Sequence, residues 1–540
     1  MAPLPASSAS PPSAAAVAAL AALTAVHAST AGVVMAAPVP APAAGAVDAD
    51  AGAAAAPPTM MHAPLTAWPS EVRAEAYDTA VAVTPALNRL VHALAADTPF
   101  LSKHLNEVSK GDDFTRRLLA LHTSPAVPLP SPLPPAFRAA PPAALGLYRY
   151  DYFMQAPPPP GSPPAPTVCQ VELNTMAASF GCLGARVRGV HALTVAAGLG
   201  PSGVTADDLP ANDVEARLAA GLAAGHAAYI ADDRSRGLDG GLPALPVVVV
   251  QPGERNVYDQ TLLGLALLRA TGGAVPLQRL SLAQLSAWGT LDATTNALVV
   301  RLPTDEASAA AVAGAGGQWA TSITAYRVSV AYFRAGYTPD DYPTDAEWAA
   351  RAALHASDAI AVPTVGVQLV GTKKVQQVLT SAGEVERYLG PAESAEVRTT
   401  FMPQLSLAPG PEGDANAATA VADPDAWVLK PQREGGGNNL YGADVAAALR
   451  RMDPVERGGW VLMRRILPVR VPNVVVRGGR GQPAEVVCEL GVFAVYLARA
   501  GGEVTINEAS GTLLRSKLAD VEDGGVAAGV AVLDSVRLVR

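Results

Sequence analysis

The alternation of apolar and polar stretches predicts an α/β unit in the middle of the chain. Residues 246–251 form a short, continuous apolar run, which is typical of a parallel strand covered on both faces. A helix is expected over 258–271, with Asn256 as its N-cap. Thr344 and Glu347 have the spacing of a capping box and predict a helix to about residue 359. Further strands are expected at 296–302 and 328–333, so strands and helices alternate here.

Outside this unit the pattern predicts a mixture of helices and strands. Residues 70–106 are expected to be helical, and Lys373 begins another helix. Strands are expected at 147–154 and 167–174, joined by a Pro-rich hairpin tip over 156–166. A second Pro-rich loop spans 125–142, more strands are expected at 427–430, 460–466 and 485–497, and the chain is expected to end in glycine-rich loops.

The first 60 residues are of low complexity, rich in Ala and Pro. An Ala-rich helix is expected over 13–35 and a flexible linker over 36–60, with the globular part beginning at His62. No Lys or Arg precedes Arg73, which fits poorly with a secretory signal or an Arg-rich transit peptide. A cytoplasmic location is therefore expected, and an organellar form stays open.

Composition excludes several classes of protein. The 540 residues are 50% hydrophobic, but the excess is mostly Ala, and no stretch of about 18 strongly apolar residues predicts a membrane span. A net charge of −9 argues against non-specific nucleic-acid binding. Three cysteines without a CxxC motif indicate reduced thiols rather than disulfides or zinc. Of the 39 basic residues only six are Lys: Lys103, Lys110, Lys373, Lys374, Lys430 and Lys517.

A glycine-rich segment follows one of the expected strands. The strand ends at Lys430, and Glu434, three glycines and two Asn come after it. Consecutive glycines let a backbone fold closely over a ligand, and their N–H groups can cradle phosphate. The spacing differs from that of a Walker A loop. A phosphate-binding loop is favoured over a simple glycine turn.

Three other segments carry candidate chemistry. Alternation places Gln170, Glu172 and Asn174 on one strand face, where their oxygens would suit Mg²⁺ or form a solvated surface. The turn at 254–260 follows a buried strand and opens a helix, which suits either a carboxylate ligand or an ordinary helix start. Arg515 and Lys517 precede a second glycine-rich loop, which could also be a solvated turn.

Together these segments resemble eukaryotic glutathione synthetases, which are ATP-grasp ligases. The matching strings occur in order from about residue 61 to the C-terminus. They are APLTAWPS, GDDFTRRLLALH, QVELNTMAASFG, ERNVYDQ, YFRAGYTP, QLVGTKKVQQ, VLKPQREGGGNNLYG, ELGVFAVY and LLRSK followed by DGGVAAGVAVLD.

The resemblance implies a mixed α+β fold, with an ATP-grasp body, a glycine-rich lid and an inserted parallel-sheet domain for substrate. The domains expected on this basis are a low-complexity segment (1–60), the N-terminal part of the ATP-grasp body (61–243), the substrate-binding α/β domain (244–371) and the C-terminal ATP-grasp region with its lid (372–540). The implied reaction joins γ-glutamylcysteine to glycine through an acyl phosphate and converts ATP to ADP and phosphate. Mg²⁺ as cofactor and a homodimer are also implied.

Site residues are implied by matching motifs, position by position. The implied Mg²⁺ ligands are Glu172, Asn174 and Glu434. The implied ATP-binding residues are Glu172, Lys373, Lys430, Glu434, Gly435, Gly436, Gly437, Asn438, Asn439, Tyr441, Met463, Arg464, Arg465, Ile466, Glu489, Lys517 and Asp523. The implied peptide-binding residues are Arg149, Ala177, Ala178, Ser179, Glu254, Arg255, Asn256, Gln260, Arg334, Ala335, Gly336, Tyr337, Arg515, Val526 and Ala527. Catalytic roles are implied for Arg149, Lys373, Lys430 and Arg515.

The chain departs from the family pattern at two of these positions. Ala177 stands where relatives often carry Ser, and Arg464 stands where the hinge often has an acid. The small pair Ala527 and Ala528 favours glycine as acceptor, since relatives that use β-alanine carry bulkier residues in this loop. The alternatives are a homoglutathione synthetase, which uses β-alanine, and a catalytically silent ATP-binding subunit with a structural or regulatory role.

Overall fold

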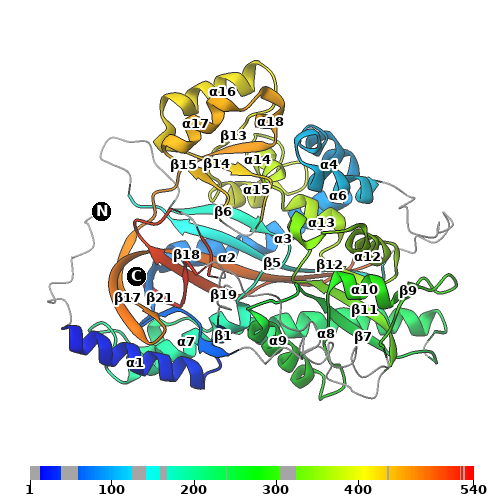
Figure 1. Ribbon diagram of the computed structural model, residues 1–540, viewed down its shortest axis with the longest axis horizontal. Coiled ribbons are helices and arrows are strands. Elements are labelled where there is room, and N and C mark those ends of the chain that lie inside the picture. The colour runs from blue at the N-terminus through cyan, green and yellow to red at the C-terminus, as the bar shows by residue number, and fades with distance from the viewer. Residues whose placement is uncertain are drawn as a thin grey trace, which may run out of the picture.

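The structure is a computed structural model that describes residues 13–37, 59–123, 141–157, 167–238, 240–303, 324–434, 437–522, 524–526 and 529–540. A seven-stranded sheet runs through the middle of the molecule (Figure 1). Its order is β17 (Arg470–Arg477), β3 (Leu65–Thr66), β20 (Val532–Asp534), β19 (Val504–Leu518), β18 (Arg480–Arg499), β5 (Ala143–Met154) and β6 (Val168–Asn174). The two longest strands, β18 and β19, pair antiparallel, and β5 lies between β18 and β6.

Helices cover both faces of this central sheet. Side chains alternate along β5, so Tyr148 and Tyr150 pack with the helices of one face while Leu145 and Leu147 pack with those of the other. The first group is α2 (Ala74–Ala82), α3 (Thr84–Ala96), α4 (Thr98–Leu105), α6 (Asp113–Thr123), α13 (Val365–Val370), α14 (Lys373–Leu379) and α15 (Pro391–Arg398), and the short α5 (Val108–Gly111) lies against α6. The second group is α1 (Ala14–Thr30), α7 (Gly181–Ala196) and α8 (Val214–Ser235).

A second, six-stranded sheet forms the unit predicted from the apolar run at 246–251. Strands β7, β8, β11 and β12 are parallel, while β9 and β10 pair antiparallel at one edge. The elements are β7 (Ala244–Val249), α9 (Val257–Ala270), β8 (Gln278–Leu280), α10 (Leu282–Trp288), β9 (Gly289–Leu291), β10 (Leu298–Arg301), β11 (Ala325–Phe333), α12 (Asp345–Ala356) and β12 (Ile360–Val362). The capping box of Thr344 and Glu347 is present, whereas the Asn256 side chain makes no cap hydrogen bond to α9.

A third, four-stranded sheet forms the lobe at the top of Figure 1. It is antiparallel, in the order β13 (Gln404–Ser406), β16 (Trp460–Arg464), β14 (Trp427–Pro431) and β15 (Leu440–Tyr441). Its helices are α16 (Pro411–Ala422), α17 (Ala443–Arg451) and α18 (Pro454–Gly458). Two small sheets complete the fold, β1 (Val34–Ala36) with β2 (Met60–His62) and β4 (Ser70–Arg73) with β21 (Val536–Val539), together with 3-10 turns at Ala206–Asp208, Pro339–Asp341 and Pro424–Ala426.

The N-terminal segment corrects one prediction. The expected Ala-rich helix is present as α1, but the globular part does not begin at His62. Val17 and Ala21 of α1 and Met35 of β1 are buried in the same apolar cluster as strands of the central sheet. The helix lies so close to β18 that a Cβ atom on Gly481 would be 2.9 Å from Val17 Cγ1. The Ala-rich composition did not predict this contact. Small residues form a buried helix face through close packing, without the large apolar side chains that indicate such a face in a sequence.

The C-terminal region corrects a second prediction. Instead of ending in glycine-rich loops, the chain returns to the central sheet as β19 and β20 and then pairs β21 with β4. The burial of residues along β19 does not alternate strictly between buried and exposed positions. Its sequence therefore lacks the alternation of apolar and polar residues from which a strand is predicted. The predicted linker and the two Pro-rich loops lie largely outside the described residues.

Candidate active site

A cavity of about 450 Å³ lies between the central sheet and the four-stranded sheet. Most of the site residues expected from the motifs line it. These are Arg149, Glu172, Asn174, Ala177, Ala178, Ser179, Tyr337, Lys373, Lys430, Glu434, Asn438, Asn439, Tyr441, Met463, Arg464, Arg465, Ile466, Glu489, Arg515, Lys517 and Val526. Gly435, Gly436, Asp523 and Ala527 lie outside the described residues.

Lys373 stands at the centre of the cavity wall, between two carboxylates. Its Nζ donates to Glu172 Oε2 at 2.9 Å and to both oxygens of Glu434 at 3.0 and 3.1 Å. The lysine begins α14, Glu172 is on β6 and Glu434 follows β14, so three separate elements meet at one ammonium group. An ammonium group offers three donors without a fixed plane, which suits this shared arrangement.

Electrostatics around Lys373 separate the two carboxylates. Burial favours the neutral form of Glu172, but the charges of Lys373 and Lys430 outweigh it and hold the pKa of Glu172 below its usual range. Burial is the dominant influence on Glu434 and raises its pKa to about 7, with the like charge of Glu172 adding to it. Burial would lower the pKa of Lys373, yet the two carboxylates raise it overall. The lysine therefore stays charged.

Lys430 reaches the same place from β14. Its Nζ donates to the backbone carbonyl of Val171 at 3.0 Å, beside Glu172. Val171 is accessible because the pairing of β5 and β6 shifts register, with Glu172 opposite Asp151 and Gln170 opposite Tyr152. The shift also corrects a prediction, since Gln170 does not share the face of Glu172 and instead lines a separate small cavity.

The sequence analysis missed the residue that holds this wall together, Asp151. It is fully buried on β5. Its Oδ1 accepts from Arg149 Nε at 2.6 Å, and its Oδ2 accepts from Arg149 Nη2 at 2.7 Å, Arg515 Nη2 at 2.7 Å and Asn174 Nδ2 at 2.8 Å. Strand alternation was a usable signal, because it places Asp151 on the same face as Arg149.

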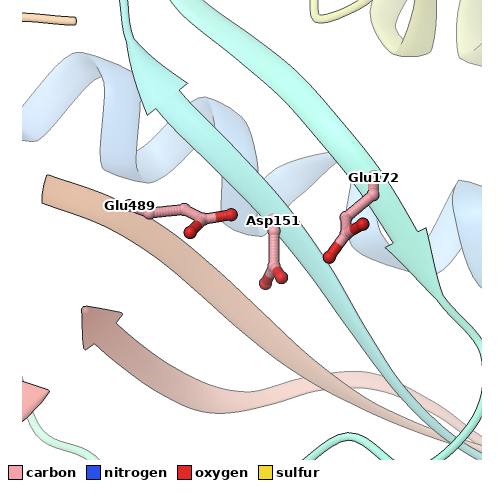
Figure 2. A group of neighbouring side chains, drawn as sticks. All are labelled: Asp151, Glu172 and Glu489. Atoms are coloured by element: carbon pink, nitrogen blue, oxygen red, sulfur yellow. The ribbon is translucent and has the colours of Figure 1, made fainter. Parts of the chain in front are cut away.

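Glu489 completes the charged floor. On β18 it accepts from Arg515 Nη2 at 3.0 Å. Burial raises the pKa of Glu489 above its usual value, against the lowering effect of Arg515. Burial would lower the pKa of Arg515, but the charges of Glu489 and Asp151 raise it overall. Figure 2 shows Glu489 and Glu172 directed from the flanking strands toward Asp151.

The oxygen donors suit a hard divalent cation. Asp151, Glu172 and Glu489 have carboxylate oxygens within 4.8 Å of one another, a spacing that could hold a metal ion. Asp151, however, already accepts four hydrogen bonds. Asn174 donates through its nitrogen, which leaves its amide oxygen for a ligand. Carboxylates with an amide oxygen form a donor set that Mg²⁺ accepts.

The hinge and the neighbouring loops form the other end of the cavity. Met463 is buried at the end of β16, and the Arg464 guanidinium lies 5.5 Å from the centre of the Trp427 ring. Arg465 pairs with Glu522 at 2.9 Å and lies 5.7 Å from the Tyr441 ring. Where relatives often carry an acid, this chain therefore has a cation that lies near an aromatic ring.

Several residues expected to bind peptide do not line this cavity: Glu254, Arg255, Asn256, Gln260, Arg334, Ala335 and Gly336. One of them, Arg334, belongs to a buried polar cluster around a second residue that the motifs did not point to, Asp259. Its carboxylate accepts from Arg334 Nη1 at 3.0 Å and from the backbone N–H groups of Phe180, Cys182 and Leu183 at 3.0–3.2 Å. It thereby ties Arg334 to the start of α7 and to the loop that carries Ser179. Asn256, next to this cluster in sequence, is buried with both amide atoms unpaired.

Arg255 contacts the N-terminal segment. Its Nε donates to the carbonyl of Ala36 at 3.3 Å, and its own carbonyl accepts from Ala36 N at 3.1 Å. The guanidinium expected to bind a carboxylate thus contacts the N-terminal segment β1. Gly437 does not line the cavity and adopts a φ of +76°, which favours glycine.

Comparisons with known proteins identify the family of this chain. A family model described as eukaryotic glutathione synthase, ATP binding domain, matches residues 15–538. The chain belongs to the eukaryotic glutathione synthase family. The glutathione synthetase of Xenopus laevis is 37% identical over 481 residues, covering 88% of this chain and 90% of the relative. The human glutathione synthetase is 36% identical over 482 residues, with the same coverage. A chloroplastic glutathione synthetase of Arabidopsis thaliana is 33% identical over 485 residues, covering 89% of this chain and 79% of the relative.

One solved structure supports the fold of a glutathione synthase. A glutathione synthetase-like effector from Globodera pallida, in its apo form, superposes with a TM-score of 0.69 and covers 98% of each chain at 18% identity. The mixed α+β fold expected from the resemblance is confirmed.

Family membership also confirms the predicted activity class. As a glutathione synthase, the chain is an ATP-dependent ligase of glutathione biosynthesis. The relatives do not favour the homoglutathione or silent-subunit alternatives. Within the described residues, no helix has the length and apolar character needed to cross a membrane.

Proposed function

We propose that this chain makes glutathione in two steps at the charged cavity. In the first, the cysteinyl carboxylate of γ-glutamylcysteine attacks the γ-phosphorus of ATP, and the bond to ADP breaks. In the second, the amine of glycine attacks the acyl carbonyl, phosphate leaves with the bonding electrons and the amine loses a proton. The observation that carries the proposal is the convergence of Lys373, Lys430, Arg149 and Arg515 on one cavity.

The four cations supply what the first step requires. A carboxylate and a triphosphate repel each other, and charge spreads over the transferring phosphoryl oxygens in the transition state. Fixed cations lower that barrier because they need no reorganisation when the charge develops. We assign Lys373 and Lys430 to the ATP phosphates, and Arg149 and Arg515 to the cysteinyl carboxylate and the transferring group.

We propose Mg²⁺ as the metal, held by Glu172, Asn174 and Glu434. When bound with ATP, it would screen the phosphate charge and orient the phosphates. The chain's own contribution is to supply hard oxygen ligands from β6 and from the segment after β14. Lys373 holds the two glutamates close together at distances of 2.9–3.1 Å. This pairing keeps the two carboxylates adjacent, where they would hold the cation.

The remaining ATP contacts are proposed from position around the cavity. The hinge residues Met463, Arg464, Arg465 and Ile466 would bind adenine, with Glu489 and Lys517 nearby. The contacts of Gly435, Gly436, Gly437 and Asp523 with ATP are proposed from the resemblance alone. Asn438, Asn439 and Tyr441 line the cavity and would contact ATP.

The peptide-binding proposal separates two groups of residues. Ala177, Ala178, Ser179, Tyr337, Val526 and Ala527 would contact γ-glutamylcysteine at the cavity. Glu254, Asn256, Gln260, Arg334, Ala335 and Gly336 would reach it only from the adjoining polar cluster. The unpaired Asn256 amide supports a polar ligand there, because an unsatisfied buried amide is costly. Arg255 stays in the proposed set only as a support of this turn.

A single assay tests the activity. The full chain is incubated with ATP, Mg²⁺, γ-glutamylcysteine and either glycine or β-alanine, and the products are identified by mass spectrometry. We expect ADP and glutathione with glycine and much slower turnover with β-alanine. Absence of ADP release with both acceptors would refute the ligase, and preference for β-alanine would refute glycine as acceptor.

A homodimer and a cytoplasmic location complete the proposal, with no nucleic-acid or membrane partner. The dimer is supported by resemblance to the family. Light scattering on a size-exclusion column tests the first, since a single-chain mass near 55.0 kDa would contradict it. Imaging of the tagged chain in its own cells tests the second.

A further inference from the structure

Within the part of the chain that the structure describes, the buried carboxylate of Asp151 accepts hydrogen bonds from side chains of the proposed active site and from no others. Its four donors are nitrogens of Arg149, Arg515 and Asn174, and its exposed fraction is 0%. An ion pair that served stability alone could use any neighbour. Here one group contacts two proposed catalytic cations and one proposed metal ligand, on three different strands.

We propose that Asp151 is the positioning residue of this site, and that it orients Arg149, Arg515 and Asn174 together. The proposal rests on the function proposed above, because the roles of those three residues come from it. Asp151 itself touches neither substrate nor metal in this account. It acts by fixing which atoms its partners present to the cavity.

Arg149 is fixed edge-on. The Nε and Nη2 edge of its guanidinium pairs with both oxygens of Asp151, at 2.6 and 2.7 Å. Such two-point pairing sets the plane of a guanidinium as well as its distance. The remaining nitrogen, Nη1, donates to the carbonyl of Ser179 at 3.2 Å, in the loop that lines the cavity. The orientation of Arg149 thus follows from Asp151 and that loop.

Asn174 is fixed by chemistry rather than by shape. A side-chain amide fits a site almost equally well in two orientations, with oxygen and nitrogen exchanged. Both oxygens of the Asp151 carboxylate act as acceptors here, so the amide nitrogen of Asn174 must face it, as it does at 2.8 Å. The amide oxygen is then the atom left for a cation. Asp151 in this way makes Asn174 an oxygen ligand.

Gly491 provides the space for this arrangement. It lies directly opposite Asp151 in the pairing of β5 and β18. A Cβ atom at this position would be 2.7 Å from both Arg149 Cδ and Asp151 Oδ1, and 3.0 Å from Arg149 Nε. Real Cβ atoms do not approach so closely, so any side chain here would displace the ion pair. This second observation is independent of the hydrogen bonds.

Two substitutions of Asp151 separate its two effects. Asp151→Asn removes the charge, and the new amide can accept only through its single oxygen. If that oxygen takes the place of Oδ2, the three donors there keep their acceptor. The hydrogen bond from Arg149 Nε to Oδ1 is then lost. Asp151→Ala removes every acceptor. We expect both variants to lose about 100-fold in kcat, since a misplacement near 1 Å has that effect. Only the Ala variant should also free the Asn174 amide.

Mn²⁺ binding reads the effect on Asn174 without turnover. The full chain is loaded with a non-hydrolysable ATP analogue, and free Mn²⁺ is measured by electron paramagnetic resonance during a titration. We expect Mn²⁺ affinity about 10-fold weaker in Asp151→Ala and within twofold of wild type in Asp151→Asn, because loss of a partner behind a ligand weakens metal binding by about 10- to 100-fold. Wild-type kcat and Mn²⁺ affinity in both variants would overturn the proposal.

Controls distinguish positioning from simple destabilisation. Asp534→Asn alters another buried carboxylate of the same sheet, which accepts from Ser70, Ser516 and Ser535. It should change stability and leave kcat and Mn²⁺ affinity unchanged. If Asp151→Ala does not fold, Gly491→Ala gives the decisive result. It should lower kcat at least 10-fold, while Gly189→Ala, whose Cβ would meet nothing within 4 Å, should not.

Failure of the two proposals can be told apart. If wild-type protein makes no glutathione, the proposed function fails, yet the Mn²⁺ titration still measures whether Asp151 orients Asn174. If wild-type protein is active and Gly491→Ala is equally active, the positioning proposal fails alone.

Discussion

Replacing Asp259 by Asn should destabilise the protein and impair peptide binding together. The carboxylate is buried between α7 and α9 and accepts four hydrogen bonds. Oδ1 accepts from the N–H groups of Cys182 and Leu183, and Oδ2 accepts from Phe180 N and Arg334 Nη1. An amide accepts on one edge only, so in Asp259→Asn one of these pairs of donors faces an NH₂ group.

The magnitude follows from what stays unsatisfied. The Arg334 side chain is only 3% exposed, and Asp259 is the carboxylate with which it forms its ion pair. Removing one partner of a buried ion pair typically costs about 3–5 kcal/mol, because the other charge is left uncompensated. We therefore expect a loss of about 3–5 kcal/mol in the free energy of unfolding. The KM for γ-glutamylcysteine should also rise, because the loop bearing Ser179 ends at the same hydrogen bonds.

Urea unfolding followed by circular dichroism, with steady-state kinetics on the folded fraction, measures both effects. The matched control is Asp345→Asn, the same substitution at an exposed ion pair with Arg117. Its side chain is 92% exposed, so we expect a change below about 1 kcal/mol. If Asp259→Asn and Asp345→Asn were equally stable, the reasoning from burial would be refuted. An unchanged KM would refute the link to the peptide loop.

Three further predictions concern other regions. Glu434→Gln should abolish ADP release and leave thermal melting by circular dichroism near wild type, because the shape is kept and a proposed metal ligand is lost; an active variant would place the metal elsewhere. Burial lowers the pKa of His191 to about 4 and raises that of Asp534 to about 6, so as pH falls from 6.5 to 4 the histidine destabilises the fold while the carboxylic acid stabilises it. Asp534→Asn removes the opposing effect, and its stability in urea should fall by about 3 kcal/mol more than wild type over this range; parallel pH profiles would contradict this. Ala21→Glu should lower the free energy of unfolding by about 3 kcal/mol, because it buries a charge beneath α1, whereas Ala22→Glu lies on the exposed face and should not. Equal urea midpoints for the two variants would mean that α1 does not pack there.

Sequence patterns predicted those helices and strands whose start or amphipathic face is determined by residues close together in the chain. The capping box at Thr344, the helix starting at Lys373 and the strand at 168–174 are all present. Each depends on neighbouring backbone groups or on one amphipathic face, so the sequence alone contains the information. The motif residues around Lys373 and Glu434 also come together at one cavity.

Features that depend on a partner strand were not predictable in this way. The register shift opposite Asp151 turns Gln170 away from Glu172, and it exists only because β5 pairs with β6. The role of Asp151 requires β5, β6, β18 and β19 to be adjacent, although residues 151 and 515 are far apart in the chain. Periodicity within one segment contains no information about which strand will lie beside it.

The scarce lysines show how composition and structure combine. Among 39 basic residues only six are Lys, and Lys373, Lys430 and Lys517 all line the cavity. Lys374 does not; it donates to Gln377 and Ser406 outside the cavity. Where two carboxylates must share one cation, a guanidinium would impose its plane on both, whereas an ammonium donates in three directions.

The same reasoning explains why arginine stands on the sheet floor. Arg149 must keep one orientation while it faces the cavity, and the two-point pair with Asp151 supplies that orientation. A lysine at this position would keep the charge but could not form the two-point pair with Asp151. Lys373→Arg and Arg149→Lys, although both conserve charge, are therefore expected to lower kcat for opposite reasons. In the first variant the planar group cannot serve both glutamates, and in the second the ammonium is no longer fixed. Wild-type kcat in either variant, measured by ADP release, would show that charge alone suffices at that position.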